Sequence, residues 1–199
     1  MLTLLHAGDF HLDTPFRSLP PREAQRRRRE QRRALDALRD LAVARQVDLA
    51  LLAGDLFDAS TIYPETVEAL SAALAGFPCP VCISPGNHDP FTGHSPYNTH
   101  IWPDNVHIFS TEAVSSLTFP DLGVRVYGFA FTSPAREDDP LAGFRPPQDG
   151  LVNLGVFHTQ AGKAGPYAPT DPAFLAQSGL AYAALGHVHQ TTPPDLSRS

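Results

Sequence analysis

The hydrophobic residues of this chain fall into two patterns, short apolar runs and longer stretches in which apolar residues recur every three or four positions. Short apolar runs bounded by turn residues are typical of buried strands. The first part of the chain contains three of them, at residues 2–8, 47–54 and 80–84. We expect each run to form a strand in the protein interior.

Helical spacing occurs in the two segments that separate these strands, residues 20–45 and 64–74. In the first segment the apolar positions with helical spacing are Leu35, Leu38, Leu41 and Ala42. The second segment begins with Pro64, a residue that is favoured in the first turn of a helix. The resulting strand–helix–strand–helix–strand order predicts a parallel sheet with helices on its faces.

The pattern changes after residue 104. Short apolar runs follow one another at 106–110, 114–119 and 124–129, with turn residues but no room for helices between them. They predict an antiparallel stretch or a second sheet. Further strands are expected at 151–158 and 180–189, with a short helix at 171–177 between them.

Composition adds the broad class of protein. The chain has 199 residues, of which 42% are hydrophobic and 18% charged, which is enough for one sizeable core. No apolar run approaches the roughly 20 residues that span a bilayer, and the N-terminus lacks the pattern of a signal peptide. We therefore expect a cytoplasmic protein without a membrane partner. Cys79 and Cys82, three apart along a strand, should face opposite sides and play a structural role.

The charge is unevenly distributed. The formal net charge is -6, yet ten of the fourteen arginines lie between Arg17 and Arg45. One interpretation is an ordinary solvated helix face. The other is a surface that contacts the phosphate backbone of a nucleic acid. The sequence leaves both open, and the first is the more common case.

Polar residues with metal-binding side chains follow five of the expected strands. In chain order they are Asp9 and His11; Asp55 and Asp58; Asn87, His88 and Asp89; His158; and His187 and His189. In open α/β sheets ligands bind beyond the carboxyl ends of the strands. We expect these side chains to meet at one edge, although each motif alone could be a turn, a helix cap or chance.

The residue types favour a metal centre. Carboxylate, imidazole and carboxamide donors without cysteine suit Mn, Fe or Zn better than Ca or Mg. Seven candidate ligands are too many for one ion but fit two ions that share a carboxylate: Asp9, His11, Asp55, Asn87, His158, His187 and His189. The other histidines, His6, His94, His100 and His107, have no such placement and are expected to be structural or superficial.

The motifs D-x-H, G-D-x-x-D, G-N-H-D, H and G-H-x-H, in this order, resemble the signature of the calcineurin-like metallophosphoesterases. The stretches LLHAGDFHLDTPF, AGDLFD and YAALGHVH are similar to the SbcD-type DNA repair exonucleases of that family. The resemblance implies an α/β fold with two mixed sheets flanked by helices and the metals at the sheet edge. It also implies a catalytic domain at residues 1–190 and a polar tail at 191–199, and it leaves open whether the last strands are present.

The resemblance also implies roles for individual residues. Asp55 would bridge two divalent ions, with Mn the expected metal. The first ion would be held by Asp9, His11, Asp55 and His189, and the second by Asp55, Asn87, His158 and His187. His88 matches the histidine that assists the leaving oxygen, and Asp58 the acidic residue that orients it. Gly86 would allow a sharp turn in front of them, and Asp89 would cap the loop.

The implied function is two-metal hydrolysis of phosphodiesters, in this branch the degradation of DNA. Two alternatives remain, a phosphoesterase that acts on small nucleotides and an inactive, truncated binding module. DNA is the expected macromolecular partner. The branch also pairs with an SbcC-type ATPase, but the segment that docks it would lie beyond Ser199.

Overall fold

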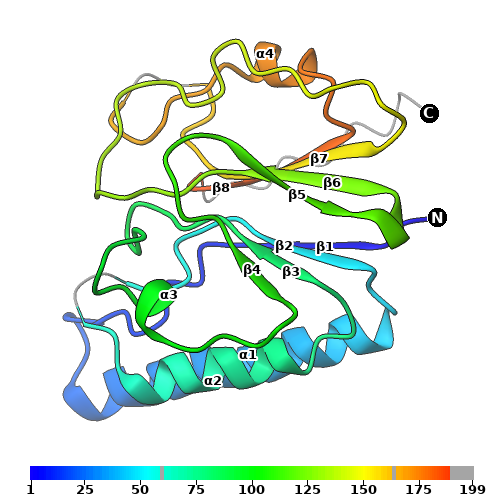
Figure 1. The fold of residues 1–199 in the computed structure, drawn as a ribbon. Helices are drawn as coiled ribbons and strands as arrows, with labels where there is room; N and C mark the ends of the chain where they lie inside the picture. The colour runs from blue at the N-terminus through cyan, green and yellow to red at the C-terminus, as the bar shows by residue number, and fades with distance from the viewer. Residues whose placement is uncertain (59–60, 163–164, 189–199) are drawn as a thin grey trace.

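The computed structural model describes residues 1–58, 61–162 and 165–188. Two four-stranded sheets pack face to face, and helices cover the outer face of the first sheet (Figure 1). The first sheet contains β1 (Leu4–Ala7), β2 (Leu49–Leu52), β3 (Val81–Ile83) and β4 (Val106–Ile108), in that order and all parallel. The second contains β5 (Ser115–Phe119), β6 (Val124–Gly128), β7 (Val152–His158) and β8 (Tyr182–Gly186). In this sheet only β5 and β6 are antiparallel.

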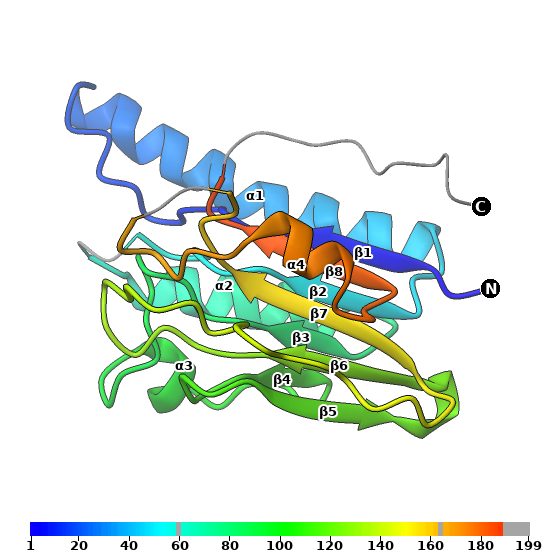
Figure 2. The same ribbon diagram turned by 90° about the horizontal axis from the view of Figure 1, so that it is seen from above.

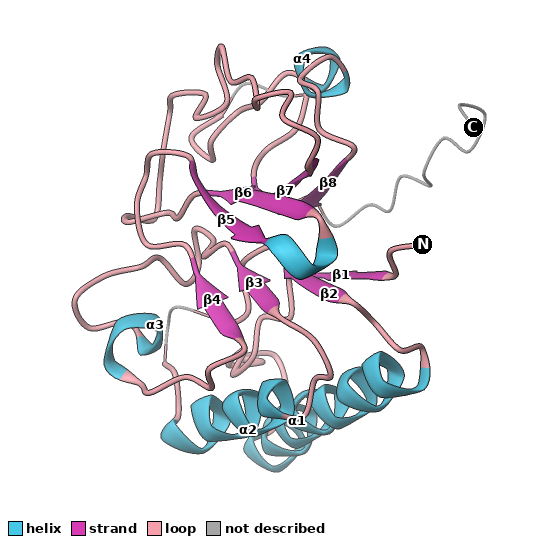
Figure 3. Ribbon diagram, turned by 45° about the vertical axis from the view of Figure 1, so that its right-hand side comes forward, coloured by secondary structure: helices cyan, strands magenta, loops and turns pink. Residues whose placement is uncertain are grey.

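The helices complete the layers. The long α1 (Pro21–Ala44) and α2 (Pro64–Ala75) lie side by side under the first sheet (Figure 3). The short α4 (Pro172–Ala176) and long loops cover the outer face of the second sheet. Two further short helices lie in connections, α3 (Pro96–Thr99) between β3 and β4 and a 3-10 turn (Pro120–Leu122) between β5 and β6. The expected fold of two mixed sheets flanked by helices is confirmed.

The hydrophobic core is arranged in layers that follow the alternation of side chains along the strands. In β2, Ala50 and Leu52 face the helices, whereas Leu49 and Leu51 face the second sheet, and all four are fully buried. A central strand that is buried on both faces reads as a continuous apolar run. The two cysteines also lie on different sides of the first sheet: Cys79, in the bend before β3, packs on the helix side, and Cys82 in β3 packs between the sheets.

Three expectations need correction. Residues 106–108 form β4, which is a strand of the first, parallel sheet. The second sheet therefore begins one strand later than the change in pattern after residue 104 suggested. The helix α3 was not expected, because four residues are too few to show a helical period. Leu41 is 47% exposed, because α1 packs along the line of Leu35 and Ala42 and position 41 lies about 100° away from Ala42 around the helix.

None of the helices in the described part of the chain is both long and apolar enough to span a bilayer. The expected tail at 191–199 lies outside the described residues.

Candidate metal centre

The predicted site residues gather at the edge where β1, β2, β3, β7 and β8 end (Figure 1). They come from two sheets, not one, and the sheets meet where β1 and β8 run past each other. The His187 N–H donates to both carboxylate oxygens of Asp9, at 3.1 Å each. The His6 ring, which contacts the Tyr182 hydroxyl at 2.9 Å and the Leu185 carbonyl at 3.2 Å, ties the same two strands together. The edge is thereby continuous across both sheets.

The segment that follows β1 has an unexpected conformation. Asp9 and His11 lie two apart, so in an extended segment their side chains would face the same way. Instead both have left-handed backbone angles, with φ of 54° and 45°, and so does Asp55 with φ of 50°. Such angles are uncommon outside glycine and concentrate at functional sites, where the surrounding structure imposes them. The backbone hydrogen bonds from Asp9 N to Gly54 O and from His11 N to Asp55 O, both 2.9 Å, supply that constraint.

One group of atoms that could bind a metal ion surrounds His158. Its Nδ1 lies 2.8 Å from the Ala53 carbonyl oxygen, so Nδ1 carries the proton and donates it. The bare Nε2 then faces two oxygens, Asn87 Oδ1 at 3.0 Å and Asp55 Oδ2 at 3.3 Å. His187 Nδ1 approaches the same Asn87 oxygen at 3.1 Å. Lone pairs that converge in this way repel one another unless a cation or a proton lies among them.

A metal ion fits this group. A histidine that ligates a metal commonly donates its other ring N–H to a carbonyl, as His158 does to Ala53. Single ligand atoms of Asp55, His158 and His187 also lie within 4.8 Å of one another. The structure thus brings together the four residues expected around the second ion. That they bind a metal remains a prediction.

A second group shares Asp55 with the first. Ligand atoms of Asp9, His11 and Asp55 lie within 4.8 Å of one another, and His11 Nε2 is 3.8 Å from Asp55 Oδ2. Asp55 therefore stands between the two groups, which is where a bridging ligand must be. The remaining expected ligand, His189, lies outside the described residues.

His88 and Asp58 form a third neighbourhood, beside His11. Ligand atoms of the three residues lie within 4.8 Å of one another, and the rings of His11 and His88 meet edge to face at 4.8 Å between centroids. His88 is exposed, whereas Asn87 and Asp89 on either side are buried. An exposed imidazole next to a carboxylate is well placed to exchange a proton with a substrate.

The charges at the centre depend on one another. Burial raises the pKa of Asp55, but the His158 ring and the His88 N–H outweigh it, so the pKa lies below its ordinary value. Burial lowers the pKa of His158, but Asp55 outweighs it and the net shift is upward. Each of the two groups thus favours the charged form of the other. A divalent cation would likewise favour the ionised Asp55 carboxylate.

Asp89 has a larger structural role than the expected loop cap. Its carboxylate is buried and accepts hydrogen bonds from the N–H groups of Asp55, Leu56 and Phe57, at 2.6–3.1 Å. It also accepts from the Gly86 N–H at 2.7 Å and the Tyr97 hydroxyl at 2.6 Å. One side chain thus joins the loop after β2, the loop after β3 and helix α3.

Burial raises the pKa of Asp89 to about 6, and the Asp55 charge acts in the same direction. The Tyr97 hydroxyl and the backbone N–H groups lower it. The hydrogen-bond donors thus favour the ionised carboxylate against the effects of burial and of Asp55. The pKa of Tyr97, which is buried beside it, is raised well above its ordinary value, so Tyr97 remains a hydrogen-bond donor.

Two glycines are required by close approach. A Cβ on Gly86 would lie 2.2 Å from Asp55 Oδ1, and a Cβ on Gly186 would lie 1.9 Å from the Ala53 carbonyl oxygen. Gly86 does not have a left-handed backbone, so the reason expected for it was wrong. It is needed because the Asp55 side chain occupies the space that a Cβ would fill.

Sequence reasoning missed three contributors, the Ala53 carbonyl, Tyr97 and Tyr167. The Tyr167 ring lies 4.8 Å from the His187 ring, between centroids. Neither a backbone carbonyl nor an isolated aromatic residue carries a sequence signal for a metal site. Only their positions in the fold reveal them.

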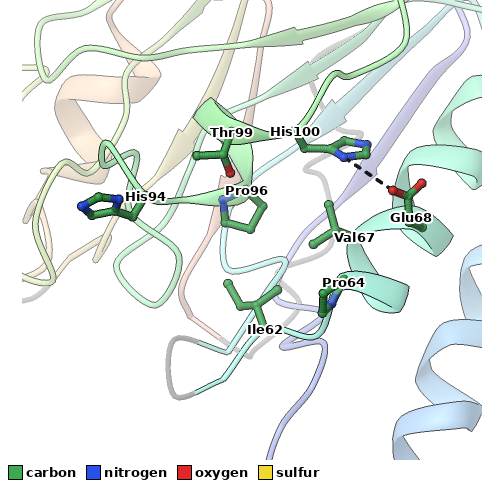
Figure 4. Close-up of a pocket in the computed structure, with 8 residues that line it drawn as sticks. All are labelled: Ile62, Pro64, Val67, Glu68, His94, Pro96, Thr99 and His100. Carbon is green, nitrogen blue, oxygen red and sulfur yellow. Dashed lines mark ion pairs between the residues drawn. The ribbon is translucent and has the colours of Figure 1, made fainter.

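A separate cleft of about 370 Å³ lies between α2 and α3 (Figure 4). It contains none of the predicted metal ligands. His100 points toward Glu68, 4.0 Å away, while His94 lies on the other side of Thr99 and Pro96. The cleft lies outside the metal centre, and the expectation that these two histidines are not ligands stays a prediction.

Comparison with known sequences identifies the family. Residues 2–191 match the calcineurin-like phosphoesterase family. The chain therefore belongs to the calcineurin-like metallophosphoesterases, a family that typically binds two divalent metal ions.

Individual relatives refine this placement. The chain is 34% identical over 205 residues to the uncharacterized metallophosphoesterase YhaO of Bacillus subtilis, covering 95% of this chain and 49% of that protein. It is 35% identical over 94 residues to SbcD, a component of the nuclease SbcCD, from Rhodobacter capsulatus. This match covers 45% of this chain and 22% of that protein. To SbcD from Bacillus subtilis it is 29% identical over 148 residues, a match that covers 71% of this chain and 31% of that protein. The chain spans about half the length, or less, of these relatives, and they are consistent with an SbcD-type branch.

We predict that Asp89→Ala destabilises the fold by at least about 4 kcal/mol, because it removes the acceptor of a buried hydrogen-bond network. Tyr97→Phe removes one of the donors and should cost only about 1 kcal/mol. Urea unfolding of the three proteins measures both changes. Similar small losses for the two variants would show that Asp89 does not hold the loops together.

Metal binding gives a second prediction. After loading with Mn(II), elemental analysis of the wild-type protein should approach two equivalents, and Asp55→Ala should lose both ions because Asp55 belongs to both groups. His187→Ala removes a side chain that belongs only to the second group and keeps the backbone N–H that contacts Asp9, so it should retain one ion. A folded wild-type protein that never exceeds one equivalent would rule out the dinuclear site.

Proposed function

We propose that this chain is the catalytic part of a DNA nuclease that hydrolyses phosphodiester bonds with two divalent ions, of which Mn is the expected one. The observation that carries the proposal is the pair of ligand groups that share Asp55, with His88 and Asp58 beside them. Two neighbouring ions suit the displacement at a phosphate because both the attacking and the leaving oxygen need stabilisation.

The residues of the chain divide the chemistry among them. Hydrolysis forms a bond from the oxygen of water to phosphorus and breaks the bond from phosphorus to the leaving oxygen. Two divalent ions held by these residues would supply the positive charge that the phosphate anion needs and would make water acidic enough to lose its proton to solvent. His88 donates a proton to the leaving oxygen as the bond breaks, and Asp58 orients the ring. Asp55 and the loops held by Asp89 keep these groups in register.

DNA as the substrate is supported by two features. Two of the relatives are named as components of the nuclease SbcCD, and the first part of α1 is rich in arginine. A partner ATPase of the SbcC type remains a prediction. A phosphoesterase of small nucleotides is the alternative that the same centre could serve.

Activity assays with Mn(II) test the proposal directly. The metal-loaded protein should cleave single- or double-stranded DNA and also hydrolyse bis-p-nitrophenyl phosphate, whereas Asp55→Ala should do neither. Hydrolysis of the small diester alone would favour the small-molecule alternative. A folded, metal-loaded protein that is inactive on every substrate would favour a non-catalytic binding module.

The role of His88 gives a separate prediction. The alkoxide that leaves from DNA is strongly basic and needs a proton, whereas p-nitrophenolate leaves without help. His88→Ala should therefore lose about 10²–10⁴-fold of the activity on DNA and far less on bis-p-nitrophenyl phosphate. Asp58→Asn should show a weaker form of the same pattern.

Two measurements test whether His88 acts as a proton donor. Metal content should be unchanged in His88→Ala, and a loss of metal would make His88 a ligand instead. If both substrates slow equally, His88 stabilises charge in the transition state and does not donate a proton.

A further inference from the structure

The N-terminal part of α1 extends beyond the sheet at the metal edge (Figures 1 and 2). The Gln31 side chain donates to the carbonyl oxygen of His11 at 3.1 Å, so this position of the helix lies level with the ligand loop. Residues 21–30 continue past it, which at 1.5 Å per residue is about 15 Å of helix. We call residues 21–30 the overhang.

Four arginines follow the outer side of the overhang and the next turn. Spacings of four, three and four residues place them on one face of the helix. This face lies opposite the buried Ala24 and Leu35, and all four side chains are exposed. The arginine row consists of Arg22, Arg26, Arg29 and Arg33.

The charge of the row is poorly balanced along the helix. Arginines three or four positions apart repel one another and destabilise a helix by a few tenths of a kcal/mol per pair. Glu30 lies near Arg26, at 3.6 Å, but it also pairs with Arg27, at 3.1 Å. In the other half of α1 the signs alternate, and Arg39 lies 2.9–3.0 Å from both Asp36 and Asp40.

Other arginines of the cluster serve the fold instead. Arg32 donates to the Thr66 hydroxyl at 2.7 Å and lies 3.6 Å from the buried Asp13, so it braces α1 against α2. The Arg28 guanidinium lies over the Tyr63 ring, 5.8 Å from its centroid. These two side chains belong to the protein's own packing and are excluded from the row.

We propose that the arginine row binds the phosphate backbone of the DNA that flanks the scissile bond. This proposal rests on the proposed nuclease function, because it names where the same substrate continues. The row runs along the segment that projects past the metal edge, and it spans about 16 Å of helix, enough for several phosphates at about 3.4 Å rise per strand. Guanidinium groups suit phosphate because their donors can pair with two of its oxygens.

A membrane surface fits the row less well than DNA. A helix that lies on a membrane needs an exposed apolar face beside its basic one. The apolar face of α1 at Ala24 and Leu35 is buried, so it is not available to a membrane. A polyanion requires only the charges.

The test is a variant in which all four arginines of the row are replaced by Gln, a residue of similar helix propensity. Binding to a fluorescent DNA duplex is measured in EDTA by anisotropy at several salt concentrations. The affinity should fall at least about tenfold, and the slope of log affinity against log salt should decrease by up to about 3.6. Hydrolysis of bis-p-nitrophenyl phosphate should be unchanged.

The control variant is Arg45→Gln, which changes an exposed arginine at the opposite end of the same helix and should bind DNA like the wild type. Circular dichroism verifies that the helix is intact, and the single variant Arg29→Gln replaces the fourfold one if that variant does not fold. Wild-type affinity in the row variant, or an equal loss in Arg45→Gln, overturns the proposal. Binding of the wild type to anionic vesicles but not to DNA also overturns it.

The two proposals fail separately. If the wild-type protein cleaves no substrate, the nuclease function falls, but binding in EDTA still reports on the row. If the wild type cleaves DNA and the row variant does so equally well, only the row is wrong.

Discussion

The whole site depends on one buried carboxylate. Asp89 accepts hydrogen bonds from the loops after β2 and β3 and from Tyr97 in α3. Without an acceptor these backbone groups would be buried and unsatisfied, which costs about 1–3 kcal/mol each. Because the loops carry Asp55, Asn87 and His88, the anchor that stabilises the fold also fixes the geometry of the site. Stability and function therefore share the same interaction.

The second constraint is the close approach of the two sheets. The candidate metal ligands that follow β1, β2 and β3 meet those of β7 and β8 only because the ends of these strands lie very close together. Gly186 permits this approach because it has no side chain that would collide with the Ala53 carbonyl oxygen. The convergence of oxygen and nitrogen lone pairs around Asn87 and Asp55 is unfavourable by itself. The packing of both sheets holds these atoms together. A cation or a proton among these atoms would remove the repulsion.

Much of this arrangement was predictable from local pattern. The strands before Asp55 and Asn87 are unbroken apolar runs, the strand before Asp9 is interrupted only by His6, and the motifs after them have a fixed order. The two cysteines were correctly placed on opposite faces, although only Cys82 lies in a strand and Cys79 precedes it in a bend. Prediction was wrong where a pattern was too short to identify an element, or where the same pattern fitted two different arrangements. Examples are the four-residue α3, the membership of β4 in the first sheet, and the exposed Leu41 at the margin of the buried stripe of α1.

The sequence by itself determined the family, the class of fold and the residues that could hold metal, because these depend on residue type, order and spacing. Tertiary structure decided which atoms meet. It divided the donors into two groups around Asp55, gave Asp89 its role between two loops, and gave Asp9 and His11 left-handed conformations in place of an extended one. It also divided the arginines into those that brace the fold and those that face solvent. Such contacts join residues that are distant along the chain, so no local rule could reveal them.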